Sequence, residues 1–491
     1  MPSKHPIEIP ELANLIASYF ERKDFARCVL VSKSWRYMLL PHQWRVVSVG
    51  LIRLDSFDMV DDLRWQGPHL DQLHRHRHLI RTLALTDSAG LDKFDYPNLT
   101  RLRIDLSLCQ ERKLSLDFIK ACPLLVHLVL VGVVMASGTW MALSNHLLIK
   151  KLHLRGLLVE AVDTPVFWKA CEKLESLTLE HVHIRGSGIP KDMVFDRLRN
   201  LDMEGNYGID YAEKMDLVLQ SPMLQSLRWE DGFGRDVEPP LIRRPNQSNY
   251  CKLYIDQNIH DTDLAFMLLG TGGELGTIAD LRLGFSCHPE TQALRALDRH
   301  FGTLVRVDLS LCLSASGSTV LDILCSCPML EVFHAKSAFV MDIAEREPWI
   351  CQQLRDLKIC IRVVEAERDL QQLVFEWLST LVRLETLEMW VPDEPSNGED
   401  VLAFRLDCGL RQLASLQQLT TLSFGQWNRD DRYMPQLGKD EVSWMLNNWK
   451  RLKIVAGRLN KNLEVDTSLR GIIESHGIVS YYSTFNNTLP F

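Results

Sequence analysis

Apolar residues recur along most of this chain in the motif L-x-x-L-x-L, where x is usually polar. The central apolar residues of five successive copies lie 24 to 26 residues apart: Leu128, Leu152, Leu177, Leu201 and Leu227. In each copy the last two apolar residues alternate with their neighbours, which predicts a short strand with one buried face. The residues between copies, such as 116–121 and 320–325, have one apolar side and predict a return helix.

Stacked units of this kind would share one continuous apolar core. The motif and its spacing, within a range of about 20–29 residues, are typical of leucine-rich repeats. We therefore expect an α/β solenoid of the ribonuclease-inhibitor type over residues 79–478, followed by a tail at residues 479–491.

The repeats become longer after Leu357, where prolines and glycines interrupt the pattern. Residues 393–400 predict an acidic loop, and residues 232–249 predict a second long loop. Near the end of the solenoid, residues 468–476 predict a last helix that Gly477 would end.

Two segments of the repeat region, residues 105–109 and 308–312, share the sequence Asp-Leu-Ser-Leu-Cys. This echo would place the strand of the earlier repeat two residues later than the motif does, and both registers keep the same face inward. Several cysteines precede the motif at equivalent places, which predicts buried thiols at Cys122, Cys171, Cys327 and Cys351.

Residues 6–47 have a different periodicity and predict three short helices. Pro10 suits the first turn of the first helix, where its missing N–H costs nothing. Asp24 is expected to cap the second helix and Ser32 the third, which would end near Pro41. One apolar stripe of the first helix is predicted at Leu12, Leu15, Ile16 and Tyr19. Because three short helices cannot bury this much apolar surface, a larger body or a partner must cover it.

The net charge is −8, with 55 basic and 63 acidic residues. This balance argues against nucleic acid as the main partner, since phosphate binding needs clustered Lys and Arg. The 12 cysteines include no C-x-x-C pair, so no zinc site is predicted. The first residues lack the apolar run of a secretory signal, and free thiols in the cytoplasm or nucleus are expected.

Residues 124–144 contain no Asp, Glu, Lys or Arg and are long enough to span a membrane. The start of this segment fits the repeat, however, so we expect a buried strand, a turn and the start of a helix. No membrane association is predicted.

No catalytic or cofactor site is predicted, because neither a phosphate-binding loop nor a G-x-S-x-G turn occurs. The glycines at 270–273 predict a loop between repeats. A cluster of alternating histidines consists of His69, His74, His76 and His78. Arg75 and Arg77 lie between them and would repel a metal cation, so residues 48–78 are expected to form a solvated linker rather than a metal site.

The N-terminal segment resembles an F-box in the order and spacing of its motifs. These are Ile9-Pro10-Glu11, Leu15-Ile16, Tyr19-Phe20, Asp24-Phe25, the run from Val31 to Arg36 (V-S-K-S-W-R), and Trp44-Arg45. It departs from the F-box pattern at Ile9 and Phe25, where Leu is commoner, and at Ser32, where Cys is usual. The match covers less than a tenth of the chain.

The resemblance implies a non-enzymatic role. F-box proteins dock a Skp-type linker protein and through it join a cullin–RING ubiquitin ligase, so this chain would be a substrate-recognition adaptor of an SCF-type ligase. The residues implied in adaptor binding are Ile9, Pro10, Leu12, Leu15, Phe25, Val29, Val31, Trp35 and Trp44. Packing within the helices is the alternative for each. For the whole chain, the alternative is a repeat scaffold without a role in degradation.

A protein substrate is expected on the concave strand face of the repeats. Residues between the inward positions of each motif must point outward, because strand side chains alternate. The candidates are Lys151, His153, Arg155, Glu180, Asp202, Glu204, Arg228, Glu230, Tyr254 and Trp390. They are basic at first and then more acidic, which favours a polar or charged substrate segment. Solvated strand surface is the alternative for each residue.

Overall fold

The computed structural model describes most of the chain. The described ranges are 9–49, 70–86, 95–107, 113–114, 117–132, 134–136, 139–186, 188–206, 208–230, 250–256, 259, 261–269, 277–284, 291–312, 315–364, 369–391, 399–426 and 435–482. The chain forms two compact units, Met1–Leu224 and Gln225–Pro490, which are described separately below. The expected loops at 232–249 and 270–273, His69 and most of the loop at 393–400 lie outside the described residues.

The first unit begins with three helices, α1 (Pro10–Ala17), α2 (Arg22–Cys28) and α3 (Lys33–Arg45). Pro10 opens α1, and the Ser32 hydroxyl caps α3 by accepting a hydrogen bond from the Trp35 N–H, as predicted. The predicted cap at Asp24 is wrong. Glu21 is the N-cap of α2, and the Asp24 carboxylate, three residues later, accepts a hydrogen bond from the Glu21 N–H.

The predicted end of α3 near Pro41 is also wrong. Proline removes one backbone hydrogen bond from the helix, yet α3 continues through it to Arg45. Leu39 and Trp44, on either side of Pro41, are both buried, so packing holds the last turn in place.

The first unit then forms a parallel sheet with one strand per repeat. In spatial order its strands are β1 (Val46–Val49), β2 (Thr82–Leu85), β3 (Arg101–Asp105), β5 (His127–Val131), β7 (Lys151–Arg155), β9 (Ser176–Glu180) and β11 (Asn200–Glu204). The inward leucines align across it, with Leu128 opposite Leu152, and Leu177 between Leu152 and Leu201. This register confirms the solenoid that the motif predicts.

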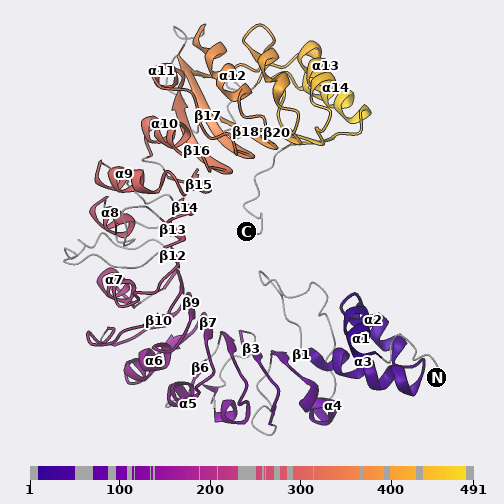
Figure 1. Ribbon diagram of the computed structural model, residues 1–491, viewed down its shortest axis with the longest axis vertical. Coiled ribbons are helices and arrows are strands. Elements are labelled where there is room, and N and C mark those ends of the chain that lie inside the picture. The colour runs from indigo at the N-terminus through magenta and orange to yellow at the C-terminus, as the bar shows by residue number, and fades with distance from the viewer. Residues whose placement is uncertain are drawn as a thin grey trace. The chain divides into compact units, whose positions relative to one another are not determined.

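The return segments of the first unit lie on one side of these strands (Figure 1). They comprise η4 (Asp117–Ala121), α5 (Thr139–Asn145), α6 (Thr164–Cys171) and α7 (Tyr211–Leu219). Four two-residue strands form a second parallel sheet, in the order β4 (Lys113–Leu114), β6 (Val134–Met135), β8 (Leu158–Val159) and β10 (His183–Ile184). Among the described residues of this unit, the other face of the first sheet is therefore free of helices (Figure 1).

The described part of residues 48–78 is packed, where a solvated linker was expected. Its first residues belong to β1, which pairs with β2. Helix α4 (Leu70–His76) and the turn η2 (Arg77–Leu79) follow, with Leu73 only 1% exposed. The His76 ring stacks on Trp44 of α3, with ring centroids 4.4 Å apart. The strand sheet thus begins directly after the third helix.

The second unit repeats the same plan. Its parallel strands are, in order, β12 (Ser226–Glu230), β13 (Lys252–Asp256), β14 (Asp280–Leu283), β15 (Arg306–Leu309), β16 (Val332–Phe339), β17 (Asp356–Val364), β18 (Thr386–Val391), β20 (Thr421–Gln426), β21 (Ile454–Gly457) and β22 (Val479–Tyr481). The short strand β19 (Glu399–Val401) pairs antiparallel with β17, so the end of the expected acidic loop joins the sheet.

Helices again lie on one side of the strands in the second unit, as α8, α9 and α10 show in Figure 1. They are α8 (Asp261–Leu269), α9 (Thr291–Leu297), η5 (Asp298–His300), α10 (Gly317–Ser326), α11 (Val340–Ala344), α12 (Gln371–Ser379), η7 (Leu410–Ser415), α13 (Lys439–Asn448) and α14 (Leu463–Ser475). The last helix begins five residues earlier than predicted and ends before Gly477, whose φ of 76° favours glycine.

The shared Asp-Leu-Ser-Leu-Cys sequence marks a turn rather than a common register. Leu83 pairs with Leu102, so the earlier repeat keeps the register of the motif and is not shifted by two residues. In both copies the aspartate accepts a hydrogen bond from a serine hydroxyl two residues later, at 2.6 Å from Ser107 to Asp105 and 2.6 Å from Ser310 to Asp308. The same local turn therefore occurs at two positions relative to the strand.

Residues 124–144 contain β5, β6 and the start of α5, as the repeat predicts. Across the described ranges, no helix is long and apolar enough to cross a membrane. The thiols predicted to be buried are buried: Cys122, Cys171, Cys327 and Cys351. Burial raises the pKa of Cys122 to about 11 and that of Cys351 to about 12, so both stay protonated near neutral pH.

Candidate functional site

The three N-terminal helices leave large apolar side chains in solvent. Their core contains the small residues Ala13 and Ala17 together with Phe25 and Leu39. In α1 the alanines face this core, so Leu12 remains 39% exposed and Leu15 56% exposed. Just before α3, Val31 is 66% exposed. The apolar stripe predicted for α1 is thus exposed at Leu12, Leu15 and Tyr19 and partly buried at Ile16, whereas the alanines form the buried face.

The predicted adaptor-binding residues fall into three groups. Ile9, Leu12, Leu15 and Val31 are exposed. Val29 and Trp35 are partly buried and pack against the core of the three helices, while Pro10 opens α1. Phe25 and Trp44 are buried inside the chain, so their side chains serve packing and present little surface to a partner.

Three large hydrophobic residues that are exposed in the described part of this module were absent from the predicted adaptor-binding set, namely Tyr19, Leu30 and Tyr37. Leu30 is 84% exposed and Tyr37 is 81% exposed. Tyr37 belongs to α3, whose apolar residues are spread around the helix. A pattern without one clear apolar side gives no signal for which residue points outward.

The helix-free strand face of the first unit holds most of the predicted substrate residues. Across the ladder, Lys151, His153 and Arg155 of β7 lie opposite Ser176, Thr178 and Glu180 of β9. The three residues of β9 in turn lie opposite Asn200, Asp202 and Glu204 of β11. Glu180 lies between His153 and Arg155. Its Oε1 is 3.0 Å from Nε2 of His153, and its Oε2 is 3.5 Å from Nε of Arg155.

The same face continues onto β3 and β5, where the predicted set named no residue. Arg101, His127 and Lys151 form one row across β3, β5 and β7. Burial, together with the nearby charges of Arg101, Lys151 and His153, lowers the pKa of His127 to about 4. Applying the motif to the copy that starts at Leu99 would have identified Arg101 and Arg103.

In the second unit, Arg228, Glu230 and Tyr254 lie on the equivalent face. Nη2 of Arg228 is 2.7 Å from Oε2 of Glu230, and the Tyr254 hydroxyl donates a hydrogen bond to Asp280. Burial and this hydrogen bond raise the pKa of Tyr254. The prediction of an exposed binding residue is wrong for Trp390 and also for His153 of β7, because only 7% and 8% of their surfaces are accessible.

His334 of β16 lies between two carboxylates from the neighbouring strands. Its Nε2 is 3.2 Å from Oδ2 of Asp356, and its Nδ1 is 3.7 Å from Oδ2 of Asp308. Burial opposes protonation, but the two carboxylates outweigh it and raise the pKa of His334. Burial also raises the pKa of Asp308, but His334 and Ser310 more than offset this and hold it at about 2.

This arrangement predicts that the stability of the second unit depends on pH. A raised histidine pKa stabilises the fold below the unfolded pKa of about 6.5, and this stabilisation is lost as pH rises through the folded pKa. We expect the wild type to lose more stability than His334→Gln between pH 6 and pH 8.5. Urea unfolding of both proteins at the two pH values measures this difference. Equal losses would contradict the assignment of the charge to His334.

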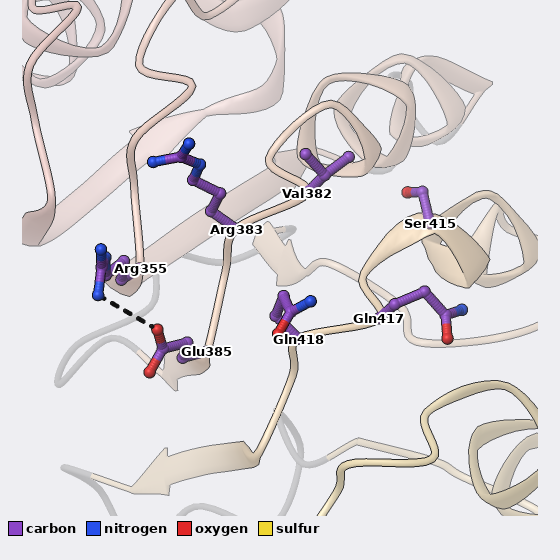
Figure 2. A pocket seen from close by; sticks show the side chains of 7 residues that line it. All are labelled: Arg355, Val382, Arg383, Glu385, Ser415, Gln417 and Gln418. Atoms are coloured by element: carbon purple, nitrogen blue, oxygen red, sulfur yellow. Dashed lines mark ion pairs between the residues drawn. The ribbon is translucent and has the colours of Figure 1, made fainter.

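A surface pocket of about 500 Å³ lies beside the turns before β17, β18 and β20 (Figure 2). It is lined by Arg355, Val382, Arg383, Glu385, Ser415, Gln417 and Gln418. Nη1 of Arg355 is 3.6 Å from Oε1 of Glu385, and Arg383 donates to the Gln353 amide oxygen. The Ser415 hydroxyl donates a hydrogen bond to the Ser379 carbonyl.

In the described parts of the chain, no group of three or more His, Cys, Asp or Glu side chains is arranged to hold a metal ion. The candidate sites are consequently surfaces: the exposed apolar side chains of the N-terminal helices and the charged strand faces of the repeats.

One parallel strand per repeat, inward leucines in register and return segments on one side define a leucine-rich-repeat solenoid. No protein-family model matches the sequence, and no curated protein matches it. Solved structures do align with it at low identity. One is the TLR13–ssRNA13 complex, with a TM-score of 0.36 and 14% identity over 77% of this chain and 48% of that one.

Two further solved structures align over more of their own length. An internalin (InlF) from Listeria monocytogenes strain 4b F2365 has a TM-score of 0.36 and 13% identity, over 83% of this chain and 88% of that one. The yeast complex of Rad7 and Elc1 has a TM-score of 0.34 and 12% identity, over 93% of both chains.

Proposed function

We propose that this chain is a substrate-recognition adaptor of an SCF-type ubiquitin ligase. In this proposal the three N-terminal helices dock a Skp-type linker protein, and the repeats hold a protein substrate in the cytoplasm or nucleus. The adaptor performs no chemistry. It raises the effective concentration of substrate lysines near the ubiquitin-loaded enzyme, which is how tethering accelerates a bimolecular step.

The observation that carries this proposal is the exposed apolar surface of the N-terminal module. Leu12, Leu15 and Val31 belong to the segment that resembles an F-box, and all three are exposed. Leu12 and Leu15 are three residues apart on α1 and so share one side of the helix. Neighbouring exposed apolar side chains are typical of protein-binding sites, since leaving them in water is unfavourable. A small core built around Ala13 and Ala17 leaves the larger side chains for a partner.

The docking surface can be tested with Leu15→Asp combined with Val31→Asp. Both side chains are exposed, so the helices should still fold. We expect linker affinity to fall on the order of a thousandfold, because buried interface anchors each contribute about 2 kcal/mol or more. Pull-down of the Skp-type linker with the full-length chain measures the loss.

The matched control is Leu147→Asp with Val162→Asp, which places the same two charges at repeat residues that are 86% and 76% exposed. This variant should retain the linker at wild-type levels. If the variant with Leu15→Asp and Val31→Asp also retains it, the N-terminal surface is not the docking site. A chain that binds the linker and cullin but supports no ubiquitin transfer to any co-purified protein would instead be a non-degradative scaffold.

A further inference from the structure

The helix-free face of the first unit separates its charges into two halves. Strands β3, β5 and β7 carry four basic side chains and one acidic one on this face, namely Arg101, Arg103, Lys151, Arg155 and Asp105. Strands β9 and β11 carry three acidic side chains and no basic one, namely Glu180, Asp202 and Glu204. A basic half therefore lies directly beside an acidic half in a single sheet.

Strand register fixes where the two halves meet. Arg155 pairs across the ladder with Glu180, and Glu180 with Glu204. Nε of Arg155 lies 3.5 Å from Oε2 of Glu180, so the boundary itself is an ion pair. The basic half extends from there to Arg101, which pairs with His127, and His127 with Lys151.

The basic half places positive charge on both sides of His127. His127 lies between Arg101 and Lys151, and its protonation is suppressed by burial and then by these neighbouring charges. An anion bound over this row would compensate the charges of Arg101 and Lys151. These charges therefore favour a negatively charged group at β3–β7, whereas Asp202 and Glu204 favour a positive group at β11.

We infer that this face binds an extended protein segment in which a block of acidic residues adjoins a block of basic residues. Neighbouring strands lie about 4.8 Å apart, so β3 to β11 is roughly 19 Å, or about six extended residues. Each block would then be about three residues long. The inference rests on the proposed function only in taking this face as the substrate surface.

Charge pattern distinguishes this occupant from a nucleic acid. A single-stranded nucleic acid carries a phosphate at every nucleotide. Its path across the face would therefore bring phosphates against Asp202 and Glu204. A uniformly acidic peptide would meet the same repulsion, and a uniformly basic one would meet Arg101 and Lys151. A segment with both blocks complements both halves.

The test compares two labelled peptides of identical composition, bound to the full-length chain in low salt. The block peptide is Glu-Asp-Glu-Gly-Lys-Arg-Lys, and the alternating peptide is Glu-Lys-Asp-Gly-Arg-Glu-Lys, both with capped termini. We expect the block peptide to bind at least about fivefold more tightly by fluorescence anisotropy, and its advantage to shrink with added salt. In NMR titrations, the block peptide should raise the pKa of His127.

Charge reversal supplies the matched variants. Arg101→Glu with Lys151→Glu should weaken block-peptide binding by about tenfold, because two favourable pairs become repulsive. Adding Asp202→Lys and Glu204→Lys should restore binding, since the peptide can then lie in the opposite direction. Lys169→Glu with Lys191→Glu makes the same change in net charge at exposed positions elsewhere and should leave binding unchanged. Thermal melts confirm that each variant is folded.

Equal binding of the block and alternating peptides would overturn the inference. It would also be overturned if the variant with all four substitutions failed to regain affinity for the block peptide. Tighter binding of a single-stranded oligonucleotide would overturn it in favour of nucleic acid. The peptide assay needs no linker protein. If the wild-type chain failed to bind the Skp-type linker in pull-downs, only the proposed ligase role would be rejected. If it bound the linker but bound the two peptides equally, only this inference would be rejected.

Discussion

Leu177→Ala is expected to lower the free energy of unfolding of the first unit by about 2–5 kcal/mol. Leu177 is fully buried in β9, and its strand neighbours Leu152 and Leu201 are buried as well. Removing three carbons there costs transfer free energy and leaves a cavity. Ladder hydrogen bonds on both sides hold the neighbouring strands, so the cavity cannot close easily.

Two variants of the same strand serve as controls for Leu177→Ala. Leu177→Met conserves volume and should cost less than about 1.5 kcal/mol. Ser176→Ala changes the half-exposed face and should stay within about 0.5 kcal/mol. Hydrogen exchange should show lost protection in β7, β9 and β11. If Leu177→Ala unfolds like the wild type, the inward register assigned to this repeat is wrong.

The solenoid could be predicted from sequence because its information is local. Each strand needs only a pair of alternating apolar residues, and successive pairs are about 25 residues apart. The inward positions of four successive strands are leucines, namely Leu128, Leu152, Leu177 and Leu201. Parallel stacking then follows from repetition, since each unit buries its apolar face only against its neighbours. Chain order therefore equals spatial order from β1 to β11.

Exposure of individual outward residues could not be predicted, because it depends on the next strand. Trp390 occupies an outward position of β18, opposite Gly425 of β20. A Cβ at Gly425 would lie 2.9 Å from Cδ1 of Trp390, so the absent side chain provides the space in which the indole is buried. Alternation along one strand indicates the direction in which a side chain points, but not the size of its neighbour on the next strand.

The N-terminal helices show the same limit. The sequence contains more apolar residues than a module of this size can bury, but it does not indicate which of them pack inside. Ala13 and Ala17 fill the core because close helix packing favours small side chains, and Leu15 is left outside. Helical spacing placed Leu12, Leu15 and Tyr19 on one stripe, whereas the tertiary structure turned that stripe partly outward.

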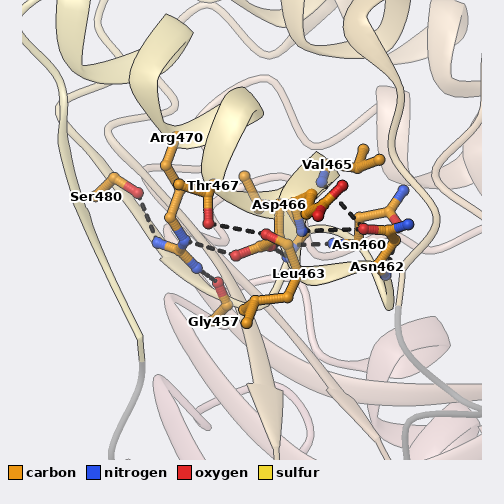
Figure 3. Close-up of polar contacts among 11 residues, drawn as sticks. Gly457, Asn460, Asn462, Leu463, Val465, Asp466, Thr467, Arg470 and Ser480 are labelled. Carbon is orange, nitrogen blue, oxygen red and sulfur yellow. Dashed lines mark hydrogen bonds and ion pairs between the residues drawn. The ribbon is translucent and has the colours of Figure 1, made fainter.

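The end of the second unit depends on a buried ion pair between Asp466 and Arg470 of α14 (Figure 3). Nε of Arg470 is 2.9 Å from Oδ2 of Asp466, and a second guanidinium nitrogen donates to Ser480 of β22 at 2.6 Å. The third donates to the Gly457 carbonyl at the end of β21. One side chain thus connects the last helix to both final strands.

Asp466 is satisfied on its other side by the backbone. Its Oδ1 accepts hydrogen bonds from the Leu459 N–H at 2.6 Å and the Asn460 N–H at 3.2 Å. Burial raises the pKa of Asp466, but these bonds and Arg470 outweigh it, so the pKa lies below its ordinary value. The stabilisation is therefore present above the unfolded pKa of about 3.9 and is lost as pH falls through the folded pKa.

Asp466→Asn is expected to destabilise the last repeats of the second unit by about 3–5 kcal/mol at pH 7, because it leaves the Arg470 charge buried without its counter-charge. Asp466→Asn with Arg470→Met should cost less than the sum of the two single changes, and the double-mutant cycle measures their coupling. Strand β22 pairs on one side only, with β21, within the described residues. Hydrogen exchange should therefore show α14 and β22 losing protection while β16 to β18 keep theirs. Additive single effects, or protection lost equally across β16 to β22, would show that the ion pair does not hold the end of the solenoid.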